Sequence, residues 1–179
     1  MRKRLFFWEA AGFLFAVAAG TLLHFTYDWS GGTVLAAAFS AVNESTWEHM
    51  KLLFFPVFFF SVIQVCFLGR NYPNVLSARA AGMLAGLALI PVLFYTYTGV
   101  TGRHWLWADI AVFVLSAAAV FAVDFVLLER RRSSALWRQV AGLLVLWILA
   151  FLFIYFTFRP PHLPLWQDAV TGAYGIPRP

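Results

Sequence analysis

Five apolar segments of membrane-spanning length constrain this chain more than any other feature. A helix that crosses a bilayer needs about 20 mostly apolar residues, and that requirement is met by residues 5–27, 47–69, 79–100, 105–128 and 136–158. The chain is 62% hydrophobic and only 12% charged, with a mean hydropathy of +0.77, whereas soluble domains are about half apolar and a quarter charged. The sequence therefore predicts an all-α, polytopic helical membrane protein with about five transmembrane helices.

A sixth apolar segment, residues 33–42, is about half as long as a membrane span. A single straight helix over residues 32–69 would measure about 57 Å at 1.5 Å per residue, against a hydrocarbon core of about 30 Å. We therefore expect a break near Asn43. Because Ser45-Thr46-Trp47-Glu48 matches a capping box, a new helix should begin at Ser45. Residues 33–42 are then a short re-entrant or interfacial helix, or the first half of a broken second helix.

The chain divides into a single helical bundle and a C-terminal segment. Residues 1–158 contain all five predicted spans, while residues 159–179 contain five of the eight prolines and cannot form a helix. The C-terminal segment is nevertheless apolar in places, with Leu163, Leu165 and Trp166. We expect residues 159–179 to fold back over the extracytoplasmic ends of the helices as an extended strap.

Basic residues predict the orientation of the bundle. Successive spans cross the membrane in opposite directions, so the N-terminus and every second loop lie on the same side. These segments contain nine of the thirteen Lys and Arg residues. Cytoplasmic loops are enriched in these residues, which predicts a cytoplasmic N-terminus and an extracytoplasmic C-terminus. The net charge of +5 is explained in this way, and we expect no nucleic-acid partner. The nine residues are Arg2, Lys3, Arg4, Arg70, Arg79, Arg130, Arg131, Arg132 and Arg138.

Most titratable residues fall at the opposite, extracytoplasmic ends of the predicted helices. They include all four histidines and five of the eight acidic residues. The remaining acids, Glu9, Asp124 and Glu129, lie toward the cytoplasm, where we expect ion pairs with Arg4 and Arg130. The extracytoplasmic set comprises His24, Asp28, Asn43, Glu44, Glu48, His49, His104, Asp109, His162 and Asp168.

The densest polar stretch, residues 43–49, stands between two strongly apolar segments. Ionisable groups at membrane depth are costly unless they are paired or hydrated, so they often mark a functional site. The alternative is structural, because Glu48 can complete the capping box and Glu44 can favour the helix N-terminus. Candidate catalytic residues are Glu44, Glu48 and His49, candidate metal ligands are His24, His49, His104 and Glu48, and candidate supporting residues are Asp28, Asn43 and Asp109.

The motif Asn43-Glu44-Ser45-Thr46-Trp47-Glu48-His49, with Phe54-Phe55-Pro56 after it and a Pro-rich ending that contains Tyr174-Gly175-Ile176, resembles a family of small multi-pass bacterial membrane proteins. Members of that family are functionally uncharacterised and share the pattern N-E-S-x-W-E-H. The resemblance covers nearly the whole chain. It implies a bacterial plasma-membrane location and assigns no activity.

Three functions are compatible with these patterns. The leading hypothesis is a polar site that binds a divalent metal such as zinc and supports hydrolysis at the membrane surface. Cys66 is the single cysteine, which excludes a Cys-rich metal site. The alternatives are a small transporter or proton- or cation-coupled carrier, and a non-catalytic membrane assembly protein. Expected partners are the lipid bilayer and a small polar or cationic ligand or a lipid-linked substrate; neither the reaction nor the oligomeric state is indicated.

Overall fold

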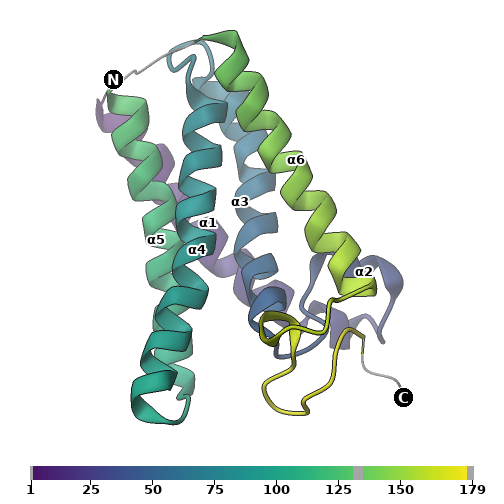
Figure 1. The fold of residues 1–179 in the computed structure, drawn as a ribbon. Coiled ribbons are helices and arrows are strands. Elements are labelled where there is room, and N and C mark those ends of the chain that lie inside the picture. Colours follow the sequence, from purple (N-terminus) through teal and green to yellow (C-terminus); the bar gives the residue numbers. More distant parts are fainter. Residues whose placement is uncertain (1, 131–134, 177–179) are drawn as a thin grey trace.

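A computed structural model describes residues 2–130 and 135–176, which form six α-helices and one 3₁₀ turn (Figure 1). Five helices are long and apolar enough to cross a membrane, and no strand occurs among the described residues. This confirms the predicted fold class. The elements are α1 (Arg2–Trp29), α2 (Val34–Phe39), α3 (Thr46–Leu68), α4 (Val75–Thr101), α5 (Leu106–Glu129), α6 (Leu136–Phe158) and η1 (Pro164–Trp166).

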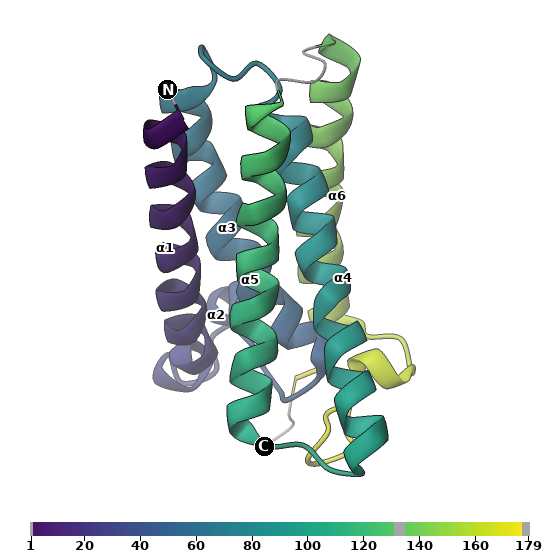
Figure 2. The same cartoon turned by 90° about the vertical axis from the view of Figure 1, so that its left-hand side faces the viewer.

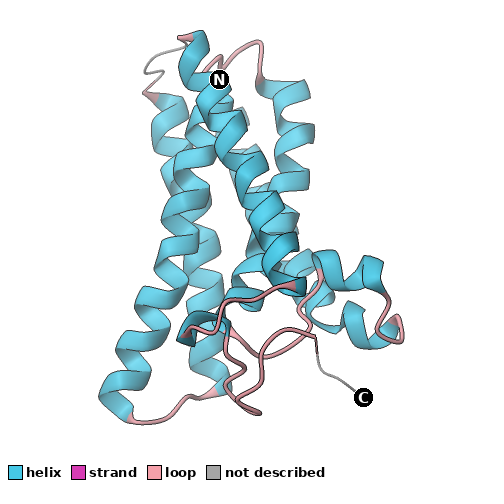
Figure 3. Cartoon of the chain, turned by 45° about the vertical axis from the view of Figure 1, so that its right-hand side comes forward, coloured by secondary structure: helices cyan, strands magenta, loops and turns pink. Residues whose placement is uncertain are grey.

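The five long helices run side by side, and the short elements gather at one end of the bundle (Figures 1 and 2). This end, called the site end below, is where α1 ends at Trp29, α3 begins at Thr46 and α6 ends at Phe158. Helix α2 and the C-terminal segment both lie there (Figure 3). The break before α3 agrees with the sequence, because Ser45 is the N-cap and its side chain accepts a hydrogen bond from the Glu48 N–H.

Helix α3 is the most buried of the long helices. It packs against α1, α4 and α6. In its most apolar stretch of 18 residues, 61% of the residues are buried, compared with 28% in the corresponding stretches of α1 and α6. Its core residues Leu53, Phe54 and Val57 have no exposed surface. The outer helices instead present large apolar side chains such as Phe7 and Trp147 at their surfaces, as expected for helices that face lipid tails.

Small residues let the helices approach closely. Gly82 and Gly86 of α4 face α5, where a Cβ on Gly82 would lie 2.6 Å from the Val120 carbonyl oxygen and one on Gly86 would lie 2.8 Å from that of Ser116. Such small-residue interfaces are typical of membrane helices, whose association depends on close van der Waals contact. Gly12, at the interface of α1 with α3 and α5, is equally enclosed.

A buried polar cluster lies at the end of the bundle opposite the site end. Arg79 of α4, with 1% exposure, contacts Asp124 at 2.8 Å and Glu9 at 3.7 Å, and Gln64 hydrogen-bonds to both Glu9 and Arg79. The predicted pairing of Glu9 and Asp124 with Arg4 and Arg130 is therefore wrong. Arg79 lies inside the bundle because two membrane-embedded carboxylates there compensate its charge.

The third acid at that end behaves differently. Glu129 lies at the C-terminus of α5 and pairs with Arg2, not with Arg4 or Arg130, at a distance of 2.8 Å. Both side chains are well exposed, so this pair contributes little to stability.

Replacement of Gly82 by valine should destabilise the bundle. Its Cβ would lie 2.6 Å from the Val120 backbone oxygen and against the Asp124 carboxylate, so the substitution pushes α4 away from α5 and disturbs the Arg79–Asp124 pair. We expect a loss of about 1–3 kcal/mol, typical of overpacking, seen as a lower Tm in detergent. Gly99→Ala in the same helix is the control, because nothing lies within 4 Å of its added Cβ. Equal Tm values for both variants would contradict this packing.

Candidate functional site

A cavity of about 600 Å³ lies at the site end, between α1, α3, α4 and α5. Most of its lining is apolar, including Leu52, Ile90 and Phe113, but polar groups lie on two of its walls. One polar group is formed by His24, Glu44 and His49, and the other contains His104 and Asp109.

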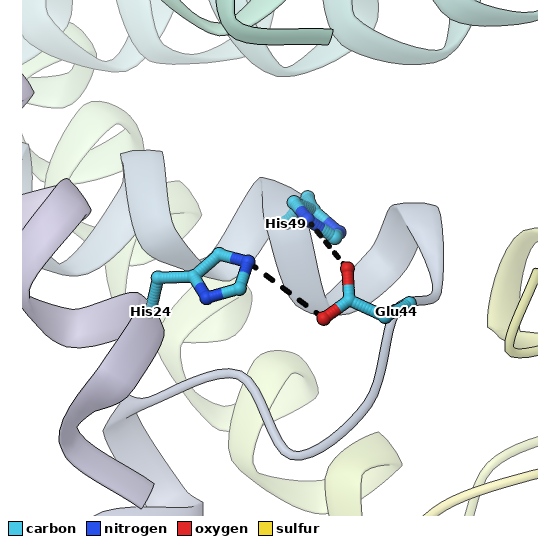
Figure 4. Close-up of side chains that lie close together, drawn as sticks. All are labelled: His24, Glu44 and His49. Atoms are coloured by element: carbon cyan, nitrogen blue, oxygen red, sulfur yellow. Dashed lines mark ion pairs between the residues drawn. The ribbon is translucent and has the colours of Figure 1, made fainter. Parts of the chain in front are cut away.

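The first polar group is a compact cluster (Figure 4). His49 Nε2 lies 3.4 Å from one Glu44 carboxylate oxygen, and His24 Nε2 lies 3.8 Å from the other. One ligand atom from each residue can be chosen so that all three lie within 4.8 Å of one another. The three residues come from α1, the α2–α3 loop and the first turn of α3, so three segments converge on one point.

The orientation of the His49 ring is fixed by its second nitrogen. Nδ1 lies 2.9 Å from the backbone carbonyl oxygen of Ser45. A carbonyl can only accept a hydrogen bond, so Nδ1 bears a proton. In the neutral ring Nε2 then has a free lone pair, directed toward Glu44. Such a hydrogen bond from the far nitrogen is what commonly orients metal-binding histidines.

His24 is positioned by a contact between α1 and the α2–α3 loop. The Ser40 hydroxyl donates to the Leu23 carbonyl and accepts from the Tyr27 N–H. Leu23 and Tyr27 are four residues apart, so the Ser40 hydroxyl contacts both groups of one turn of α1. Because His24 follows Leu23 directly, this contact ties the position of its side chain to the loop that contains Glu44.

The C-terminal segment supports Glu44 from the other side. Asp168 accepts a hydrogen bond from the Glu44 N–H at 3.3 Å, and Asn43 donates to the Gly175 carbonyl at 2.8 Å. Trp166 stacks on Trp47. The described part of the segment therefore lies across the site end, and it contributes Ala169 and Val170 to the cavity wall.

Asp168 is held as a carboxylate by backbone donors. Burial raises its pKa, but hydrogen bonds from the N–H groups of Thr171, Val170 and Glu44 outweigh that effect and leave the pKa below its usual value. The charged form is therefore the form that closes this turn of the C-terminal segment against the α2–α3 loop.

Glu48 points away from the His24–Glu44–His49 cluster. Its carboxylate lies 2.6 Å from Lys51 Nζ and also accepts hydrogen bonds from the Val42 N–H and the Thr157 hydroxyl. Lys51 completes its three donor contacts with the Ala37 carbonyl and Thr157. Both charges are buried and fully partnered, so Glu48 has a structural position.

The second polar group on the cavity wall is a histidine–carboxylate pair. His104 Nδ1 lies 3.2 Å from Asp109 Oδ2, and the Tyr97 hydroxyl donates to the other oxygen of Asp109. An ionised carboxylate only accepts hydrogen bonds, so His104 Nδ1 bears the proton and Nε2 is free to act as a base.

The structure thus brings together some of the residues selected from the sequence and separates others. His24, Glu44 and His49 form the cluster, while His104 and Asp109 pair on another part of the same cavity wall. Asn43 anchors the C-terminal segment, and Asp28 is exposed on α1 without lining the cavity. Sequence reasoning missed Ser40, Tyr97, Lys51 and Thr157; of these, Lys51 alone had a usable signal, as a lysine three residues after a glutamate in an apolar helix.

Comparison with known proteins gives a family without an assigned activity. The sequence model of one protein family, described as "Family of unknown function (DUF6512)", matches residues 3–176. Neither a curated protein nor a solved structure matches the chain. The match agrees with the resemblance to an uncharacterised family, while the shared N-E-S-x-W-E-H pattern stays a prediction.

Substitution of Asp168 by asparagine should loosen the C-terminal segment. Hydrogen bonds to a charged acceptor contribute about 1.5–3 kcal/mol, so we expect a lower Tm than wild type at pH 6. Because the pKa of Asp168 is depressed, its stabilisation is present above its unfolded-state pKa of about 4 and disappears as the pH falls below that value. The Tm difference between wild type and Asp168→Asn should therefore shrink in acid.

The matched control is Asp28→Asn, since Asp28 is exposed and does not line the cavity. A Tm difference for Asp168→Asn that is as large at pH 3 as at pH 6 would contradict the assignment.

Proposed function

The chain belongs to the Family of unknown function (DUF6512), and we propose that its function depends on a divalent-cation site formed by His24, Glu44 and His49. Two imidazoles and one carboxylate are a common ligand set for catalytic zinc, which usually keeps a fourth position open for water. The open position here would face the cavity, because all three residues line it.

The observation that supports this proposal most strongly is the contact between His49 and Glu44. With its proton on Nδ1, the neutral form of His49 directs a lone pair at a carboxylate oxygen 3.4 Å away. Two electron-rich atoms repel at this distance unless a cation lies between them. A proton on Nε2 would remove the repulsion between His49 and Glu44. His24 approaches the same carboxylate, however, and three converging ligand atoms favour a metal.

The spacing also suits a metal of zinc's size. Ligand atoms about 2.0–2.2 Å from a tetrahedral zinc lie about 3.3–3.6 Å from one another. The distance from His49 Nε2 to Glu44 is 3.4 Å and that from His24 Nε2 to Glu44 is 3.8 Å. The three ligand atoms lie within 4.8 Å of one another, so metal binding at these distances requires the cluster to contract.

Metal-assisted hydrolysis is the reaction that this arrangement supports best. A bound divalent metal lowers the pKa of a coordinated water to about 7 and polarises a carbonyl. His104, oriented by Asp109, lines the same cavity and supplies a base or acid for proton transfer. The two polar groups together provide the parts of a hydrolytic site.

Transport across the bundle has less support. A carrier would need a hydrated path from the site end to the cluster of Glu9, Arg79 and Asp124. Between these levels every long helix contributes residues with 0% exposure, which favours a dry, packed layer. These residues are Ala16, Leu53, Phe54, Val57, Met83, Ala117, Val120 and Phe153.

The proposed location is a bacterial plasma membrane, with the site on the extracytoplasmic side. Support comes from the resemblance described above and from basic residues such as Arg2, Arg4 and Arg70, which are exposed at the end opposite the site end. Such residues are typical of the cytoplasmic side.

Metal analysis of purified variants tests the proposed site. Wild-type protein is expected to bind about one equivalent of zinc, and His49→Ala should lose it with little change in Tm, since removal of one of three protein ligands opens the site. His162→Ala is the control, because His162 stacks on Tyr174 away from the cluster. Zinc retained at one equivalent in His49→Ala would exclude His49 as a ligand.

A second variant separates the metal site from its structural support. Glu48→Gln leaves the buried Lys51 charge without its carboxylate, which should cost about 3–5 kcal/mol, while His24, Glu44 and His49 remain. We expect a marked fall in Tm with zinc still bound by the folded fraction. Loss of zinc from protein of unchanged Tm would instead make Glu48 a metal ligand.

A further inference from the structure

The cavity next to the His24–Glu44–His49 cluster has the features of an acyl-chain binding site. Its volume of about 600 Å³ lies within the range of about 300–1,000 Å³ that ligand pockets occupy. Away from the polar groups its walls consist of aliphatic and aromatic side chains from four helices. These include Val17, Leu52, Ile90, Phe94, Val112 and Phe113.

Three of the helices that line the cavity approach one another closely beside it. At Gly20 of α1, a Cβ would lie 2.6 Å from the Phe113 ring of α5 and 2.7 Å from the Leu52 carbonyl oxygen of α3. The three helices are therefore in close contact at this level, and residues of α1 on both sides of it, Val17 and His24, line the cavity.

The side between α1 and α5 is apolar and exposed. Phe25 of α1 lines the cavity and is 46% exposed, while Leu106 and Ile110 of α5 line it and are 76% and 54% exposed. All three belong to helices long and apolar enough to cross a membrane, so their exposed faces meet lipid. The same side chains thus border both the bilayer and the cavity, which gives a hydrocarbon chain a lateral route inward.

The charges near the cavity restrict the head group. The lining contains the carboxylates of Glu44 and Asp109, and no lysine or arginine appears among its described residues. An anionic phosphate head group usually requires Lys or Arg partners, and none lines this cavity. An uncharged or cationic head group is compatible with the carboxylates.

We propose that the cavity binds an acyl-chain amphiphile with an uncharged or cationic head group, with the chain between α1 and α5 and the acyl ester or amide bond at His24, Glu44 and His49. This inference rests on the proposed function, because hydrolysis makes the amphiphile a substrate. Water adds to the acyl carbonyl carbon, the bond to the head-group oxygen or nitrogen breaks, and the leaving group takes a proton. The products are a fatty acid and an alcohol or amine.

Photolabelling of the full-length protein in detergent micelles tests this inference. The probe is a monoacylglycerol with a diazirine in its acyl chain, and labelled positions are mapped by mass spectrometry. We expect labelling at cavity residues such as Phe25, Ile110 and Phe113. Val114→Trp, which fills the cavity from α5, should reduce this labelling about tenfold.

The matched control is Leu115→Trp, since Leu115 neighbours Val114 but is 56% exposed and does not line the cavity. It should label as wild type does. Thr21→Phe fills the cavity from α1 and serves as a second test if Val114→Trp unfolds. Labelling spread over the outer faces of the helices, and equal in all variants, would overturn the inference.

Two further measurements separate this inference from the metal site. His49→Ala should still label, because the apolar walls do not need the metal; retained labelling without zinc in wild type would refute the metal site alone. Stoichiometric zinc with no cavity labelling would refute the acyl-chain site alone. Unlabelled monoacylglycerol should compete with the probe better than phosphatidic acid of the same chain length, and the reverse order would overturn the assignment of the head group.

Discussion

The buried ion pair between Glu48 and Lys51 is the interaction on which the site end depends. A lone charge at this depth is costly, so each side chain needs the other and several hydrogen-bond partners. Through those partners the pair joins α3 to the loop at Val42, to the short helix α2 at Ala37 and to α6 at Thr157. This network helps to hold the loop that presents Glu44 and the helix start that presents His49, together with the contacts of Ser40, Asn43 and Asp168.

The two polar regions of the bundle have different consequences because their partners differ. Arg79 is enclosed by two carboxylates and an amide from three other helices, an arrangement that ties the helices together. At the site end, Glu44 instead meets two imidazole nitrogens beside a cavity. An imidazole is not always charged, as a guanidinium is, so these histidines leave room for a cation in the proposed function.

Much of the fold follows from the sequence, because membrane spans and helix caps are encoded locally. The apolar lengths predicted five long helices, and Ser45 predicted the start of α3 to within a residue. Side-chain partners could not be predicted in the same way. From the sequence, Glu48 suits a capping box as well as it suits a metal ligand. Its hydrogen bond with Thr157 of α6 forms only in the folded bundle. The sequence predicts nearby basic partners for Glu9 and Asp124 because Arg79, their partner in the structure, stands at the start of its helix, where a loop residue is expected.

X-ray absorption at the zinc edge on the purified, zinc-loaded protein tests the central claim most directly. Coordination by His24, Glu44 and His49 predicts a first shell of nitrogen and oxygen atoms at about 2.0–2.2 Å, with the outer-shell scattering of two imidazole rings. His24→Ala and His49→Ala should each remove the signal of one ring. A spectrum without imidazole scattering, or one unchanged in both variants, would contradict the proposed metal site.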